Sequence, residues 1–133
     1  HFYASYIVTR VPLIIYIPGA KPKSIDAPVA LMDVMPTILS LVDVKTNISM
    51  QGINLVPTIK NPKSADKSRA ILGDSYIIKE NWRLLLYPTM QLSDLRYDRN
   101  ESNNLAFERQ DKVKELINEY NDFTIKSHLK NNG

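Results

Sequence analysis

The sequence contains no cysteine, only two histidines and only four glycines. Without thiols, this chain cannot form disulfide bonds, thiolate nucleophiles or cysteine-ligated zinc sites. The two histidines, His1 and His128, stand at opposite ends of the chain, and no residue near either one in the sequence indicates a catalytic pair. His128 lies in a polar tail and is interpreted as solvated. The four glycines are isolated, so the sequence offers no glycine-rich phosphate loop.

Strong charge and long apolar segments are also missing. The 17 basic and 14 acidic residues leave a net charge of +3, and the basic residues are scattered. This excess is too small to indicate binding to nucleic acid or to an anionic membrane. The longest apolar run, residues 11–17, includes a proline and is far shorter than the about 20 residues of a membrane-spanning helix. The hydrophobic content of 44% is typical of a globular domain.

The first half of the chain has the pattern of an α/β layer. Residues 11–17 form a continuous β-rich run, which predicts a buried strand of a parallel or mixed sheet. Without its neighbours, such a strand would expose an apolar patch prone to association. A helix is predicted next, with Asp33 as its N-cap and Pro36 in its first turn. Apolar residues fall on one face of this helix: Met35, Ile38, Leu39 and Val42.

The second half has the pattern of an antiparallel sheet followed by a helix. We expect hairpin turns at Gly73-Asp74 and Glu80-Asn81. Alternation in the third strand places Trp82 and Leu84 on one face. Apolar residues at helical spacing over 113–123 predict a C-terminal helix that packs on the sheet. The four expected strands are residues 69–73, 75–79, 82–87 and 91–97.

Three acidic residues, Asp94, Asp98 and Glu101, are spaced closely enough to mimic part of a hard-cation site. However, Arg96 and Arg99 are interleaved with them. Interleaved opposite charges favour local ion pairs and turn hydrogen bonds instead. From the residues alone, therefore, the sequence predicts a soluble fragment with an α/β first half and an α+β second half, and with no active site of its own.

Three stretches of the chain resemble motifs of the sulfatase family. The first is R-V-P-L-I at residues 10–14, followed by P-G at 18–19. The second is D-x-x-P-T at residues 33–37, followed by Q-G-x-x-L at 51–55. The third is W-R-L at residues 82–84, followed by D-L-x-x-D-x-x-E-x-x-N-L-A at 94–106. Their order and spacing resemble the C-terminal third of sulfatases. Some positions depart from the family pattern: Ser93, Arg99 and Val42-Asp43.

The resemblance implies a fold of the alkaline phosphatase superfamily. Residues 1–60 would be the C-terminal edge of the large α/β domain. Residues 69–130 would be a small C-terminal α+β domain, with a four-stranded antiparallel sheet and a packed helix. We therefore expect residue 1 to be an internal position of a longer protein.

The resemblance also implies what this chain does not encode. Sulfatases use a formylglycine made from the first residue of a C/S-x-P-x-R motif, and this sequence contains no such motif. The family's calcium ligands lie upstream and have no counterpart here. We therefore expect a sulfuric ester hydrolase fragment that is inactive alone, with no catalytic or metal-binding residue and no cofactor in this chain. Calcium is implied for the complete enzyme.

One substrate-binding position is implied by the same comparison. The family often places a lysine nine residues before the arginine of the R-V-P strand, and His1 stands nine residues before Arg10. His1 is thus the candidate residue for contact with the sulfate group. Arg10 itself is expected to order the end of the strand.

The implied partners are the upstream catalytic portion of the same protein and a sulfated small molecule or glycan. The resemblance suggests a periplasmic, extracellular or cell-envelope location. Two alternatives remain open. One is the C-terminal part of a phosphoglycerol or phosphoethanolamine transferase of the same superfamily, which an upstream threonine nucleophile would indicate. The other is a non-catalytic structural or binding module.

Overall fold

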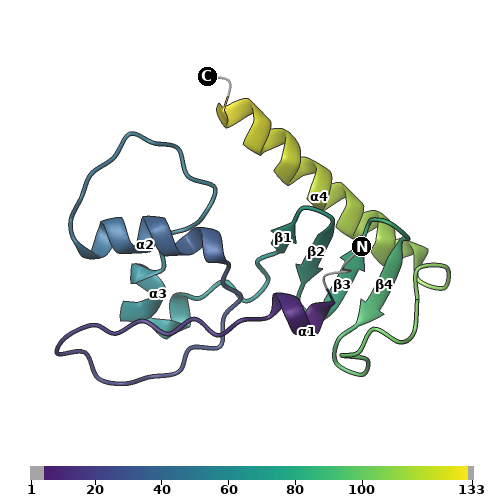
Figure 1. Cartoon of the computed structure of the whole chain (residues 1–133), viewed down its shortest axis with the longest axis horizontal. Coiled ribbons are helices and arrows are strands. Elements are labelled where there is room, and N and C mark those ends of the chain that lie inside the picture. The colour runs from purple at the N-terminus through teal and green to yellow at the C-terminus, as the bar shows by residue number, and fades with distance from the viewer. Residues whose placement is uncertain (1–4, 132–133) are drawn as a thin grey trace.

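The structure of the chain, a computed structural model, describes residues 5–131, with side chains as far as Lys126. Figure 1 shows the helices of residues 34–60 on one side, and the sheet with the long C-terminal helix on the other, where the first short helix also lies. The helices are α1 (Tyr6–Thr9), η1 (Leu31–Asp33), α2 (Val34–Leu41), α3 (Val56–Lys60), η2 (Pro62–Ser64) and α4 (Gln110–Asn131). The strands are β1 (Ile71–Gly73), β2 (Tyr76–Lys79), β3 (Trp82–Leu85) and β4 (Gln91–Asp94).

The four strands form one antiparallel sheet in the order β1-β2-β3-β4, as the sequence predicts. The second hairpin turn is at Glu80-Asn81 as expected, because Lys79 pairs with Trp82. The first turn lies one residue later than predicted. Gly73 pairs with Tyr76, so Asp74-Ser75 forms the turn, and Gly73 belongs to the strand.

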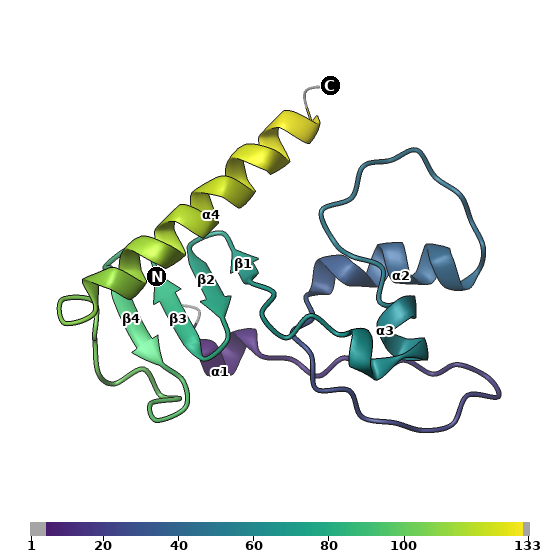
Figure 2. The same cartoon turned by 180° about the vertical axis from the view of Figure 1, so that it is seen from behind.

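Helix α4 covers one face of the sheet, which Figure 2 shows from behind. The core between them contains Ile77, Leu84 and Leu92 from the strands and Leu116 from the helix, all with exposed fractions of 0%. The Tyr120 hydroxyl donates to the Asp74 carbonyl at 2.8 Å and holds the helix over the first hairpin. The small α+β unit expected for the second half is confirmed. The helix begins at Gln110, three residues before the first apolar residue of the predicted pattern.

The strand predicted for residues 11–17 is wrong for this chain. Within residues 5–131, residues 11–16 form no backbone hydrogen bond to another element. Ile14 is 88% exposed and Tyr16 87% exposed, so the apolar run is not buried. The physical reason is the absence of partners, because a doubly buried strand needs neighbouring strands and covered faces. The α/β layer expected for residues 1–60 is therefore not present in the described part, which contains short helices and irregular segments but no strand there.

The predicted helix after Asp33 is confirmed as α2, but its burial is the reverse of the expected one. Met35 is 61% exposed and Ile38 50% exposed, whereas Thr37 is buried. The apolar face of α2 thus has no cover in the described chain. None of the helices in the described residues is long and apolar enough to cross a membrane.

Candidate functional site

Asp33 is the centre of a buried polar node between the short helices and the sheet. Its carboxylate is fully buried and accepts four hydrogen bonds. Two come from backbone amides, Ala30 N–H and Ile53 N–H, each at 2.8 Å. Two come from the Arg69 guanidinium in a bidentate pair at 2.6 and 2.8 Å. Each carboxylate oxygen accepts two hydrogen bonds, and the positive charge of Arg69 balances the negative charge of Asp33.

The prediction that the Asp33 side chain caps the turn at Met35 and Pro36 is wrong. Asp33 has helical backbone angles, with φ −79° and ψ −15°, and its side chain makes no capping hydrogen bond to α2. Capping residues normally have extended angles, which aim the side chain at the following amides. Here the carboxylate instead accepts the Ala30 amide behind it and joins distant segments of the chain.

The node joins the two sequence stretches that make up the second motif. The Thr37 hydroxyl donates to the Asp33 carbonyl at 2.6 Å and accepts the Leu55 amide at 2.9 Å. Asn54 donates to the Ser40 hydroxyl at 2.9 Å. Gly52 lies so close to the Met32 backbone that an added Cβ would overlap its carbonyl group. Residues 33–37 and 51–55 therefore interlock through specific atoms of Asp33, Thr37 and Gly52.

Burial would raise the pKa of Asp33, but the hydrogen bonds from Arg69, Ala30 and Ile53 outweigh it and leave this pKa below its ordinary value. A carboxyl whose pKa is lowered in the folded state stabilises that state above its unfolded pKa, about 3.9. The contribution declines as pH falls below that value and through the lower folded pKa.

We expect the stability difference between the wild type and the D33N/R69M variant to be full at pH 7 and to shrink below about pH 4. The variant has no titrating group at this position. Other acidic residues with lowered pKa values, such as Asp94 and Asp98, are present in both proteins and cancel in the difference. Urea unfolding between pH 7 and pH 3 measures the effect. A constant difference across this range would show that the Asp33 charge does not stabilise the fold.

The three clustered acidic residues are engaged with donors, as expected for ion pairs and turn hydrogen bonds. Asp94 forms a bidentate pair with Arg96 at 3.0 and 2.6 Å. Asp98 accepts the backbone amides of residues 102 and 103 at 3.0 and 2.8 Å. Glu101 pairs with Arg83 in the buried part of the sheet. The interpretation as local ion pairs and turn hydrogen bonds is confirmed for Asp94 and Asp98, whereas Glu101 pairs with Arg83, which is 18 residues away on β3.

The Glu101 carboxylate forms a second buried node, on the face of the sheet opposite α4. One oxygen accepts from the Arg83 guanidinium, and the other accepts the Tyr6 backbone amide at 2.6 Å. The Arg83 guanidinium also lies over the Tyr76 ring, 4.9 Å from its centroid. Sequence reasoning placed Glu101 in a motif but missed its contact with Tyr6, because no local pattern reveals a contact across 95 residues.

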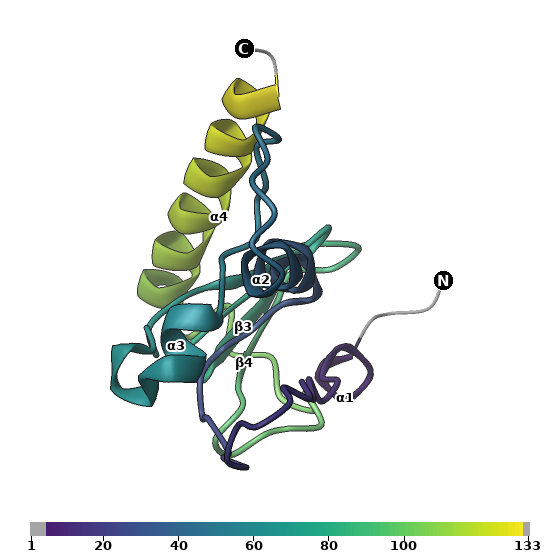
Figure 3. The ribbon, with the colours of Figure 1, turned by 90° about the vertical axis from the view of Figure 1, so that its left-hand side faces the viewer.

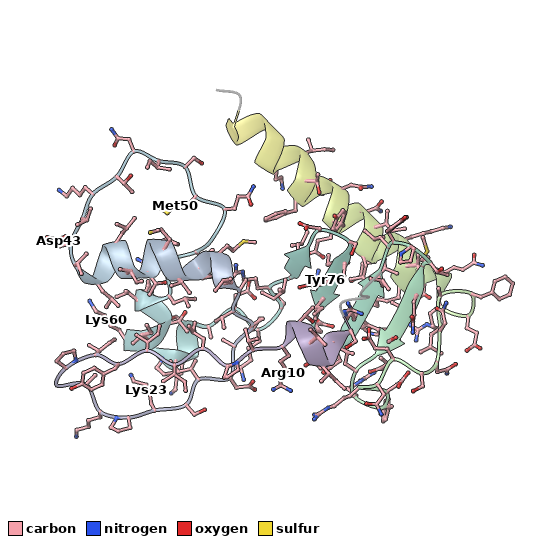
Figure 4. All side chains as sticks on the ribbon, in the orientation of Figure 1. Arg10, Lys23, Asp43, Met50, Lys60 and Tyr76 are labelled. Carbon is pink, nitrogen blue, oxygen red and sulfur yellow. The ribbon has the colours of Figure 1, made fainter. Side chains whose placement is uncertain are left out.

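A cavity of about 900 Å³ lies between the two nodes. It is bordered by α1, residues 26–32, residues 67–72 and the β2 side chains Tyr76 and Ile78. Figure 4 shows Tyr76 on the sheet and Arg10 at the end of α1. Most of the charge around the cavity is already paired, since Arg69 binds Asp33 and Lys67 lies 4.0 Å from Asp26. The cavity therefore offers no built anion site by itself.

The predicted substrate-binding residue, His1, lies outside the described residues, as does the side chain of His128. Arg10 is exposed, and its guanidinium lies over the Tyr6 ring at 6.0 Å from the centroid. It therefore follows α1 instead of ordering a strand end. In the part of the chain that the structure describes, no group of three or more metal-ligating side chains is arranged to hold an ion.

No protein-family model matches the sequence. The chain is similar to a protein described as "Uncharacterized sulfatase YidJ" from Escherichia coli (strain K12), with 27% identity over 111 residues. The match covers 74% of this chain but only 22% of that protein. The chain thus spans about a fifth of the relative's length. The similarity supports a distant, sulfatase-like relationship.

Proposed function

We propose that this chain is the C-terminal part of a sulfatase-type sulfuric ester hydrolase and that it contributes a wall of the substrate pocket without supplying the reacting groups. The observation that carries the proposal is the interlocked node of residues 33–37 and 51–55. These are the stretches that resemble the sulfatase motifs, and they contact each other through Asp33, Thr37 and Gly52. The partial similarity to a sulfatase agrees with this assignment.

Hydrolysis of a sulfate ester requires an attacking oxygen and cations near the developing negative charge. The resemblance implies calcium for the complete enzyme, but the described acidic residues do not fit a calcium site. Asp33, Asp94 and Glu101 each bind an arginine, which leaves no convergent set of oxygens. We therefore assign the nucleophile and the metal ligands to another portion of the protein. His1 remains our proposal for a residue that contacts the sulfate group.

We further propose that residues 1–60 belong to the edge of a larger α/β domain and that residues 69–130 form a small domain beside it. The exposure of residues 11–16 supports this division. Ile14 and Tyr16 are 88% and 87% exposed, and Val11, Leu13 and Ile15 are exposed as well. An exposed apolar run with unpaired backbone groups is typical of a strand whose neighbours are elsewhere.

The proposal is tested by expressing the polypeptide that includes the sequence upstream of His1 and assaying an aryl sulfate, a phosphate diester and a phosphate monoester. We expect turnover of the sulfate ester, and loss of it when the upstream formylglycine position is replaced by alanine. Preferential turnover of the phosphodiester through an upstream threonine would favour the transferase alternative. Turnover of none of the three esters by a correctly modified protein would favour the non-catalytic module.

Replacing Ile14 with lysine is expected to have opposite effects in two settings. In the 133-residue chain it should leave the helical content unchanged and reduce self-association, because Ile14 is 88% exposed there. In the longer polypeptide it should destabilise the fold by several kcal/mol, since it would bury an unpaired charge. Sedimentation velocity and thermal unfolding measure the two effects.

The matched control is I48K, which alters another exposed isoleucine, at 75% exposure, in the loop that follows α2. It should be nearly neutral in both settings. If I14K were as neutral as I48K in the longer polypeptide, residues 11–17 would have no strand partner, and the proposed domain assignment would be wrong.

A further inference from the structure

The two edges of the sheet differ in whether their backbone groups are paired. At the β4 edge, the Leu92 amide donates to the Asn104 side chain at 3.0 Å, and the Leu92 carbonyl accepts the Leu105 amide at 2.8 Å. At the β1 edge, the outward amide and carbonyl of Leu72 have no hydrogen-bond partner within residues 5–131. One edge is therefore closed by the chain itself. The other is open, and an open edge is where a further strand can add.

The pairing of the strands shows that the backbone groups of Leu72 point away from the sheet. The Leu86 amide donates to the Ser75 carbonyl at 2.7 Å, so the odd-numbered residues of β2 bond to β3. The even-numbered residues of β2 bond in the other direction, to the odd-numbered residues of β1. Leu72 is the even-numbered residue of β1, and its N–H and C=O therefore face the open side.

Two cavities lie beside this edge, one on each face of the sheet. The larger, of about 900 Å³, is on the α1 side and is bordered by Tyr76 and Ile78. The smaller, of about 350 Å³, is on the α4 side and is bordered by Lys79 and Phe123. Figure 3 shows α1 and α4 on opposite sides of the strands. Leu72 borders both cavities, so the space beside β1 is open on both faces of the sheet.

This arrangement of edge and cavities matches the requirements of an added strand. Neighbouring strands lie about 4.8 Å apart, and successive side chains of a strand point to opposite faces. A strand beside β1 would place its side chains alternately in the larger and the smaller cavity, while its backbone bonds to Leu72. Apolar side chains border both cavities, such as Ile78 in the larger and Ile53 in the smaller. The added strand should therefore be apolar on both faces.

The opposite wall of this space, residues 26–32, is fixed relative to β1. Arg69, just before the strand, binds the Asp33 carboxylate in a bidentate pair, and the same carboxylate accepts the Ala30 amide at 2.8 Å. Arg69 and Ala30 border both cavities. The two walls are thus already held in place, which lowers the entropic cost of binding a segment between them.

We propose that the open edge of β1 binds an extended apolar segment of the polypeptide that precedes residue 1, which adds a fifth strand to the four-stranded sheet. This inference rests on the proposed function, in which this chain is the C-terminal part of a longer protein. The similarity to the sulfatase covers only 22% of that protein, so a protein of that length has several hundred further residues' worth of segments from which to supply a strand. The added strand would join the C-terminal sheet to the larger domain.

Hydrogen exchange at the Leu72 amide, read by mass spectrometry with residue-level fragmentation, tests this proposal. In the 133-residue chain this amide should exchange rapidly, because it has no partner in the described residues. In the longer polypeptide it should exchange at least about tenfold more slowly, because the added strand accepts it. The controls are the amides of Leu92 and Leu86, which are already bonded and should be protected in both polypeptides.

Equally rapid exchange of the Leu72 amide in the two polypeptides would overturn the proposal. So would protection of this amide in the 133-residue chain that increases with protein concentration, since it would identify a second copy of the chain as the occupant. The longer polypeptide is also assayed with an aryl sulfate. Absence of turnover, with Leu72 protected, would refute the proposed function and still support the added strand.

A matched pair of variants tests the backbone bond at the open edge. L72P and L72A both truncate the side chain, but only L72P removes the amide hydrogen. Proline is tolerated at a sheet edge where its nitrogen faces away from the neighbouring strand. L72P should therefore melt further below L72A in the longer polypeptide than in the 133-residue chain. An equal difference in the two polypeptides would contradict a strand bonded to Leu72.

Discussion

Replacing Asp33 with alanine is expected to lower the free energy of unfolding by about 3–5 kcal/mol, because it leaves the Arg69 guanidinium buried without its partner. The side chain of Arg69 is only 16% exposed. The substitution also removes the acceptor of the Ala30 and Ile53 amides. The loss should be concentrated in α2 and α3, since these helices are joined through this node. Urea unfolding followed by circular dichroism measures it.

Two controls identify the cause of the loss. D26A removes a fully exposed carboxylate that is 4.0 Å from Lys67, and it should change stability by less than about 0.5 kcal/mol. The double variant D33A/R69M should be no less stable than D33A, because the uncompensated charge is removed along with its partner. A loss below about 1 kcal/mol in D33A would contradict the interpretation of this node as the joint between the two motif stretches.

The second large effect is expected for Leu116, which is fully buried between α4 and the sheet. L116A should lower the free energy of unfolding by about 2–5 kcal/mol, through the lost burial and the cavity left behind. Trp82, the single tryptophan of the chain, belongs to the same core and reports unfolding there by fluorescence.

The matched control is I125A on the same helix, where the side chain is 57% exposed. It should cost much less, because little apolar surface is removed from contact. Hydrogen exchange on L116A also tests the proposed domain division. If residues 69–130 form their own domain, protection should fall in the sheet and α4 but persist around Asp33. Equal loss of protection in both regions would show that they unfold as one unit.

The second half of the chain could be predicted well because its determinants are local. Alternating apolar positions, such as Trp82 and Leu84, specify which face of a strand is buried. The Glu80-Asn81 turn lies where it was expected, and the helical spacing after Val113 gives α4. The first hairpin turn lies one residue later than the predicted Gly73-Asp74, because the residue types of a turn do not by themselves determine the pairing register of the strands.

The first half was predicted less well because a buried strand and a covered helix face need packing partners, which the described residues do not supply. The apolar run at residues 11–17 has the composition of a strand, but a strand exists only with a neighbour. The same reasoning applies to α2, whose apolar face is left exposed at Met35 and Ile38. An apolar pattern in the sequence indicates which face of a segment is suited to burial, but it does not show whether a packing partner is present.

The two polar nodes lie beyond what local patterns can show. Asp33 has the residue type of a helix cap, yet its carboxylate binds Arg69, which is 36 residues away. Glu101 has a motif position, yet its contact with Tyr6 spans 95 residues. Long-range polar contacts depend on the tertiary arrangement, which propensity and spacing do not encode. The resemblance to sulfatase motifs singled out these residues without giving the physical reason.

The most direct test of the account is reconstitution of activity from two polypeptides. In the proposed function, a polypeptide that precedes residue 1 carries the formylglycine, and this polypeptide is assayed with an aryl sulfate in the presence and absence of residues 1–133. We predict turnover only when both are present, and none from either alone. Desulfation by the 133-residue chain alone, or equal turnover without it, would contradict the claim that this chain completes the pocket while the reacting groups lie elsewhere.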